Sequence, residues 1–379
     1  MSSTVKAERG AGAVQKAFMD NRLRDLEPSS HPEVLPSPLP DDLDDRVAAA
    51  EAMLHHCNMC ELRCGVDRAA GERGRCGLAA ESRVYKRYVS LNEELELLPA
   101  LRVFLGGCNF RCPWCDEAPN AFEGAGGPVG PMEWATELGG PLAGRVRAVS
   151  LLGGEPTLHV HTILGLAAAI AGRVPLALNT NMYMTPEVLE LLDGVVACYL
   201  ADFKFGNAAC AQRLAGVPNY SAVVQRNLLF AAARAQVIVR HVLLPGHLGC
   251  CFRPAADWIA QHLPGARFQL YPGYIPCGPA SCDPEIGRLN TRAEVRVATD
   301  YLASLNLCRS PLPSATGRPS PARSAPGEGV ASLTLGPDGR IYCHDLTPQL
   351  AFVLSMLCPG DAELLARTTQ SYERPAARG

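Results

Sequence analysis

The sequence has no long apolar run. Its apolar stretches, such as residues 162–172, are well short of the about 20 residues that a membrane-spanning helix needs. The N-terminal residues carry charges and form neither the apolar core nor the small-residue cleavage site of a secretory signal. We therefore expect a soluble protein that acts in the cytoplasm and has no membrane partner.

The chain also has no excess of charge of one sign. It contains 35 Lys and Arg against 38 Asp and Glu, for a net charge of −3. Binding to a phosphate backbone needs a basic surface, so we expect no nucleic-acid partner. The motifs GxSxG, HExxH, GxxxxGK[ST] and GxGxxG are absent. Their absence argues against a lipase-like hydrolase, an HExxH zinc protease, a P-loop site and a Rossmann dinucleotide site.

Cysteine, in contrast, is abundant, with 16 in 379 residues. A reducing compartment does not favour a disulfide framework, so the spacing must distinguish metal ligands from catalytic or merely buried thiols. The composition is that of a globular protein. We divide the chain into a weakly structured arm (1–45), a helix plus cysteine-rich segment (46–92), a main domain (93–308), a Ser/Pro-rich linker (309–327) and a hairpin–helix tail (328–379).

Within the main domain, apolar strand patterns alternate with helical patterns. Near-continuous apolar strands separated by helices predict a parallel sheet covered by helices. Six units predict an α/β fold of the partial (β/α)6 barrel type, with functional residues at the carboxyl ends of the strands. The predicted strands are 101–107, 147–154, 174–181, 195–205, 235–246 and 266–274.

The segment GGCNFRCPWC places Cys108, Cys112 and Cys115 on the loop that leaves the first of these strands. A 4Fe–4S cluster normally takes four cysteines, so three thiolates from one loop would leave one iron open to another ligand. The alternatives are a zinc knuckle and cysteines with no shared function.

A second group of cysteines precedes the main domain. Cys57, Cys60, Cys64 and Cys76 could form a closed four-ligand site. The spacing does not choose between structural zinc, a second iron-sulfur cluster and no metal. Cys250 and Cys251 lie beyond a later strand and have no recognisable ligand spacing.

The three-cysteine loop, with Trp114 before its last cysteine, resembles the radical S-adenosylmethionine (SAM) superfamily. GGEP at the end of the second strand is similar to the methionine-binding motif of that superfamily. The segments FLGGCNFRCPWC, LLGGEPTLH, NTNMYMTPEVLELLDG, LADFKFGN and RHVLLPGH resemble its pyruvate formate-lyase activating enzyme-like branch, whose substrates are largely unassigned. The resemblance covers about residues 55–285 and favours a real metal site at the N-terminal cysteines.

The resemblance implies a role for each matching residue. Cys108, Cys112 and Cys115 would hold three irons of a 4Fe–4S cluster, whose fourth iron chelates the amino and carboxylate groups of SAM. Further cofactor contacts would come from the strand ends. They are Gly153 and Gly154, which let the backbone approach the methionine end, Glu155 as acceptor for its ammonium group, Asn179, Asn181, Asp202, Lys204 and Arg240.

The implied reaction begins with an electron from a donor such as flavodoxin or ferredoxin. Reductive cleavage of SAM then gives a 5′-deoxyadenosyl radical that takes a hydrogen atom from the substrate. The substrate is either a glycyl residue of a partner enzyme or a small molecule or peptide that is modified directly. A non-enzymatic iron-sulfur electron-transfer protein is the alternative from another class.

Overall fold

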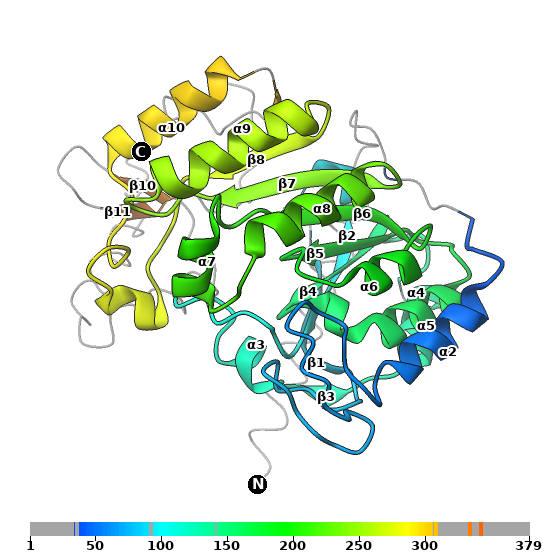
Figure 1. The fold of residues 1–379 in the computed structure, drawn as a ribbon. Coiled ribbons are helices and arrows are strands. Elements are labelled where there is room, and N and C mark those ends of the chain that lie inside the picture. The colour runs from blue at the N-terminus through cyan, green and yellow to red at the C-terminus, as the bar shows by residue number, and fades with distance from the viewer. Residues whose placement is uncertain are drawn as a thin grey trace, which may run out of the picture.

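The computed structural model in Figure 1 describes residues 34, 38–90, 94–140, 142–305, 307–309, 333–335 and 341–343. Most of the predicted arm, the linker beyond Arg309 and the predicted tail helix lie outside these residues. Two short strands of the predicted tail hairpin are described, β10 (Leu333–Leu335) and β11 (Ile341–Cys343), and they pair antiparallel.

The described part of the chain is built on one nine-stranded sheet in the order β3-β1-β2-β4-β5-β6-β7-β8-β9. From β2 to β9 each strand pairs parallel with the next, whereas β1 and β3 form an antiparallel edge. The strands are β1 (Arg83–Ser90), β2 (Ala100–Leu105), β3 (Gly127–Pro128), β4 (Ala148–Gly153), β5 (Leu176–Thr180), β6 (Val196–Asp202), β7 (Gln236–Val242), β8 (Arg267–Tyr271) and β9 (Cys308–Arg309).

All six predicted strands are present, as β2, β4, β5, β6, β7 and β8. The open, mostly parallel sheet is consistent with a partial barrel, but the repeat is not limited to six strands. Sequence analysis missed β3 and β9, which have two residues each, and β1, whose sequence RVYKRYVS is interrupted by basic residues. Most side chains of β1 are partly exposed, so this antiparallel strand does not need the continuous apolar pattern of a central parallel strand.

Helices lie around the outside of this sheet (Figure 1), and α2 packs beside α5. The α-helices are α2 (Leu43–Ala52), α3 (Asn120–Glu123), α4 (Pro131–Gly139), α5 (Val160–Ile170), α6 (Pro186–Leu191), α7 (Ala208–Ala215), α8 (Tyr220–Ala232), α9 (Arg253–His262) and α10 (Arg292–Ser304). The shorter turns are η1 (Leu95–Leu97), η2 (Pro156–His159), the π-helical η3 (Leu248–Phe252) and η4 (Gly278–Cys282). No helix in the described ranges is long and apolar enough to cross a membrane.

The two faces of the sheet differ in chemistry. Side chains of the outer face join the main apolar core beneath the helices. On the inner face, a small apolar layer includes Ala100, Ala148, Ala177, Cys198 and Ile238. Nearer the carboxyl ends the same face becomes polar, because residues two apart on a strand point the same way.

Strand register brings polar residues of the inner face together. Asp202 of β6 pairs with Arg240 of β7, which in turn pairs with Gln269 of β8. At the other side of the sheet Arg102 of β2 pairs with Ser150 of β4. The predicted residues Asp202 and Arg240 are therefore direct neighbours on the face that the strands enclose.

Tyr220 holds the end of β6 in place. Its buried hydroxyl donates to the Asp202 carbonyl at 3.0 Å and accepts from the Lys204 backbone N–H at 2.7 Å. Because Tyr220→Phe leaves both backbone groups without this partner, we expect it to lower the free energy of unfolding by about 1–3 kcal/mol. Thermal unfolding of the full chain checks this. Tyr301→Phe, which removes an exposed hydroxyl, is the control and should change stability by less than about 0.5 kcal/mol.

Candidate active site

The three-cysteine loop leaves the carboxyl end of β2. Cys112 is buried, and Cys108 and Cys115 are partly exposed. Burial raises the pKa of Cys112 to about 11 and that of Cys115 to about 12, and the charges of Asp116 and Cys112 add to the shift at Cys115. Three thiols that would each resist ionisation alone are suited to a cationic metal, which displaces their protons on binding.

The Arg111 side chain shapes this loop. Its guanidinium donates to the Cys108 carbonyl at 2.6 Å and to the Phe110 carbonyl at 2.8 Å. It also donates to the backbone carbonyl of Arg75, next to Cys76 of the second cysteine group. One side chain therefore connects the two cysteine segments.

The GGEP segment is joined to the cysteine loop through its backbone. Gly154 N–H donates to the Leu105 carbonyl at 2.8 Å, and Glu155 N–H donates to the Gly107 carbonyl at 2.9 Å. Gly153 has a φ of 108°, and a Cβ there would lie 2.7 Å from the backbone of Leu105. A Cβ on Gly154 would collide with the Gly107 carbonyl. In the structure these glycines allow close approach of two strand ends, and their predicted approach to methionine stays a prediction.

Glu155 is a fully buried carboxylate at the centre of this region. Its oxygens accept from the Thr157 N–H and hydroxyl, the Thr180 hydroxyl at 2.7 Å and the Asn181 N–H at 2.8 Å. Burial raises the pKa of Glu155, and these hydrogen bonds oppose the shift. The carboxylate thus connects the ends of β4 and β5, and its predicted contact with the SAM ammonium group stays a prediction.

The two predicted asparagines lie in different places. Asn181 is buried and donates from its amide to Asn109 Oδ1 of the cysteine loop at 2.8 Å. Asn179 lies on the inner face of β5, half-buried and opposite Leu200 of β6. Asn181 therefore positions the cysteine loop, whereas Asn179 lies on the polar inner face.

Asp202 and Lys204 form an ion pair beside the cysteine loop. Lys204 Nζ lies 2.6 Å from Asp202 Oδ2, and both groups act electrostatically on the Cys112 thiol. Although burial opposes it, attraction to Asp202 and Cys112 leaves the pKa of Lys204 raised. Lys204 is therefore a fixed positive charge beside a predicted cluster ligand.

Arg240 extends this charge network across the inner face. Its guanidinium nitrogens lie 3.8 Å from Asp202 and 3.8 Å from Glu94, and it stacks over the Tyr271 ring. Glu94 is buried and accepts a hydrogen bond from the Tyr271 hydroxyl at 3.3 Å. Sequence analysis missed Glu94 and Tyr271, because Glu94 lies in the connection between β1 and β2, with no motif around it.

Two contacts near the last cysteine of the loop were not predicted from the sequence. Glu117 accepts from Tyr85 at 2.9 Å and from Lys86 at 2.7 Å, which fastens the loop to β1. The Cys277 thiol donates to the Trp114 carbonyl at 3.0 Å, from a loop far along the chain. In the sequence, the basic residues of β1 indicate the contact with Glu117. No motif indicates the contact between Cys277 and Trp114.

The N-terminal cysteine group lies against the same loop. The thiols of Cys57, Cys64 and Cys76 interact electrostatically, and Cys60 interacts with Cys57 and Cys76. Burial raises the pKa of Cys60 to about 12, and the amide of Asn109 opposes that shift. A Cβ on Gly74 would lie 2.7 Å from the Cys64 sulfur, so this glycine makes room for the thiol. These interactions place the four cysteines near one another, and a metal site at this group stays a prediction.

Comparison with known proteins agrees with this arrangement. A family model for the radical SAM superfamily matches residues 103–259. The uncharacterized protein MJ0674 of Methanocaldococcus jannaschii is 35% identical over 279 residues, 71% of this chain and 80% of that protein. The chain belongs to the radical SAM superfamily, and it is a radical SAM enzyme. Its assignment to the activating enzyme-like branch stays a prediction.

Other similarities cover less of the chain. The 7-carboxy-7-deazaguanine synthase of Neisseria meningitidis serogroup B is 31% identical over 109 residues, 28% of this chain and 48% of that protein. Among solved structures, QueE from Escherichia coli has a TM-score of 0.36 and 14% identity, covering 60% of this chain and 92% of that one. Streptococcus suis SuiB bound to SAM has a TM-score of 0.40 and 16% identity, covering 54% and 47%. Structural similarity this distant does not bear on the substrate.

The residues present fit the cofactors that the superfamily implies, a 4Fe–4S cluster and SAM. Soft thiolate ligands suit iron-sulfur clusters, and the loop supplies three of them at one strand end. The polar inner face beside them offers charged and amide groups for the amino acid and ribose of SAM.

His159 joins the GGEP segment to the start of the cysteine loop. Its ring is fully buried, with Nδ1 2.8 Å from the Ser82 hydroxyl and Nε2 2.9 Å from the Gly106 carbonyl. Burial, with a contribution from Arg68, lowers the pKa of His159 to about 3. The unfolded chain takes up a proton at this residue below about pH 6.5, whereas the folded chain does not. The contribution of His159 to stability is therefore fully present above about pH 6.5. It is lost progressively as the pH drops from 6.5 towards 3.

We expect His159→Gln, which cannot ionise, to reduce this loss. Between pH 7.5 and 5.5 the free energy of unfolding of the variant should fall by about 1.4 kcal/mol less than that of the wild type. Thermal unfolding at both pH values measures the difference. His262→Gln, at an exposed histidine of α9, should keep the wild-type pH dependence, and equal slopes for all three proteins would contradict the prediction.

Proposed function

We propose that Cys108, Cys112 and Cys115 hold three irons of the 4Fe–4S cluster and leave the fourth iron to SAM. The observation that carries this proposal is the junction of three elements at one edge of the sheet. The cysteine loop is hydrogen-bonded to the GGEP backbone, and its Cys112 lies beside the Asp202–Lys204 ion pair. A metal with an open position at this edge would face the polar inner surface of the strands.

The bound cluster and SAM supply one-electron cleavage of the sulfonium and a 5′-deoxyadenosyl radical that takes a hydrogen atom from the substrate. The residues of this chain bind and orient the reactants. We assign Gly153, Gly154 and Glu155 to the methionine end and Asn179 and Asn181 to the ribose or carboxylate. Asp202, Lys204 and Arg240 would fix the charged groups, because their ion pairs hold them on the inner face before a ligand arrives.

For the substrate we propose a glycyl residue of a partner enzyme, which the resemblance to activating enzymes supports. The second candidate is a small molecule or peptide modified directly. The similarity to 7-carboxy-7-deazaguanine synthase, whose name describes a small-molecule product, supports this candidate over part of the chain. An assay with deuterated substrate distinguishes the two candidate substrates, because only the true substrate transfers deuterium to 5′-deoxyadenosine.

We further propose that Cys57, Cys60, Cys64 and Cys76 bind a second iron-sulfur cluster, with structural zinc as the alternative. The contact between the two cysteine segments supports electron transfer to the active-site cluster, because Arg111 donates to the backbone carbonyls of both Cys108 and Arg75. A reductant such as flavodoxin or ferredoxin would supply the electron, and the cytoplasm would keep these thiols reduced.

Replacing Cys108, Cys112 and Cys115 together by alanine tests the site. After anaerobic reconstitution, the variant should lose about four irons per chain and all formation of 5′-deoxyadenosine from SAM. Iron analysis and chromatography measure both. Cys282→Ala, at an exposed cysteine of η4, should retain iron and product. Product from the triple variant would contradict the assignment.

Variants of the Asp202–Lys204 ion pair test whether the inner face of the sheet binds SAM. We expect Lys204→Gln or Asp202→Asn to slow 5′-deoxyadenosine formation by about 10- to 100-fold while iron content stays unchanged, because loss of one partner leaves the other, partly buried charge misplaced. Single-turnover assays at saturating SAM give the rate. Arg234→Gln breaks an exposed ion pair with Asp193 and should leave the rate unchanged. Wild-type rates in both ion-pair variants would remove these residues from the proposed SAM site.

A further inference from the structure

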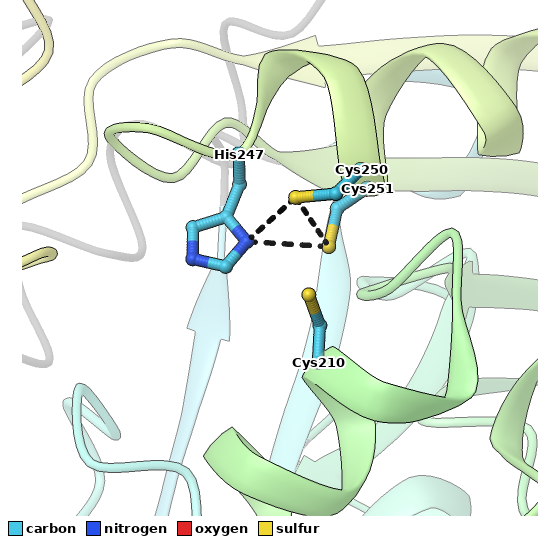
Figure 2. Close-up of side chains that lie close together, drawn as sticks. All are labelled: Cys210, His247, Cys250 and Cys251. Carbon is cyan, nitrogen blue, oxygen red and sulfur yellow. Dashed lines mark hydrogen bonds between the residues drawn. The ribbon is translucent and has the colours of Figure 1, made fainter.

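A third group of metal-type ligands lies apart from both cysteine segments. Figure 2 shows Cys210, His247, Cys250 and Cys251, whose ligand atoms all lie within 4.8 Å of one another. Cys210 comes from α7, which follows β6, and His247 comes from the loop after β7. Cys250 and Cys251 lie on η3, just before α9. Two segments therefore converge on one point, α7 and residues 247–251.

The distances within the group match a single tetrahedral ion. His247 Nδ1 lies 3.2 Å from Cys250 Sγ and 3.4 Å from Cys251 Sγ, and the two sulfurs are 3.9 Å apart. Zinc bonds of about 2.3 Å to sulfur and about 2.0–2.1 Å to nitrogen give tetrahedral edges of about 3.8 Å between sulfurs and about 3.6 Å between sulfur and nitrogen. The Cys210 sulfur lies within 4.8 Å of each of the other three ligand atoms and would supply the fourth ligand.

The local backbone explains how two adjacent cysteines reach one point. Residues Leu248–Phe252 form a π-helical turn, in which the Phe252 N–H donates to the His247 carbonyl at 3.1 Å. Successive side chains in such a wide turn are rotated by less than the about 100° of an α-helix. The sulfurs of Cys250 and Cys251 can therefore face the same side. Their separation of 3.9 Å is far greater than a disulfide bond.

Neighbouring groups hold the ligands in position. The other ring nitrogen of His247, Nε2, lies 3.4 Å from the Glu285 carboxylate, which is itself paired with Arg213 at 2.6 Å. A histidine that binds a metal through one nitrogen commonly has a carboxylate at the other. Asn207 donates from its amide to Cys210 Sγ at 3.2 Å and to the Cys250 carbonyl at 2.6 Å. These contacts orient the cysteines and the histidine towards one another.

We propose that Cys210, His247, Cys250 and Cys251 bind one zinc ion in a closed structural site. Three thiolates and one imidazole are a common ligand set for structural zinc. The short distances favour one ion over an iron-sulfur cluster, whose irons each need a cysteine of their own. The ion would join α7 to the loop after β7 and so fix the end of β6, which carries Asp202 and Lys204. This inference does not depend on the proposed function.

Metal analysis of the full chain, purified anaerobically, tests the proposal. The Cys250→Ser/Cys251→Ser double variant should contain one zinc per chain less than the wild type, with unchanged iron. The difference is independent of what the N-terminal group binds. Cys282→Ser, at an exposed cysteine outside all three groups, should keep the wild-type zinc content. Equal zinc in the double variant and the wild type, loss of iron in place of zinc, or a wild type without zinc would each overturn the assignment.

Milder variants cover the case in which the double variant does not fold. His247→Cys should retain the zinc, while zinc-edge X-ray absorption loses the nitrogen contribution at about 2.0–2.1 Å. Glu285→Gln should raise the zinc dissociation constant about 10- to 100-fold in competition with a chelator. A nitrogen contribution unchanged in His247→Cys would overturn the proposed ligand set. A zinc dissociation constant unchanged in Glu285→Gln would contradict the proposed role of Glu285 in orienting His247.

Discussion

The candidate active site depends on the backbone junction between two strand ends. Gly154 and Glu155 donate to the carbonyls of Leu105 and Gly107, so the GGEP segment and the cysteine loop form one unit. The contact is close enough that a Cβ on Gly154 would collide with Gly107. Glu155 then uses its carboxylate to add the end of β5 to this unit. Main-chain hydrogen bonds and the side chains of Asn181 and Arg111 position the loop, and none of these contacts uses its thiols.

Charge on the inner face is arranged in pairs before any ligand binds. Lys204 is held by Asp202, and Arg240 lies between Asp202 and Glu94. Buried charges are tolerated when they are paired, and pairing also restricts their side chains to one arrangement. The same pairs would present fixed positive and negative groups to SAM, at little cost in ordering when it binds.

The sequence predicts much of the fold because central parallel strands are apolar on both faces. All six predicted strands are present, and the predicted cysteine loop follows the first of them. β1 was missed because most of its side chains are partly exposed, which allows Arg83, Lys86 and Arg87 in the strand. The Cys210 group was missed for a different reason, since its ligands come from α7 and from the region after β7, and their spacing in the chain matches no motif.

By itself the sequence determined the six central strands, the two cysteine segments and the superfamily, because these are local patterns in the chain. Only the tertiary structure decided that Glu155 connects strand ends, that Glu94 lies beside Arg240, and that Cys210 meets His247. The physical reason is that strand register and loop packing bring distant residues together. No periodicity or spacing in one segment carries that information.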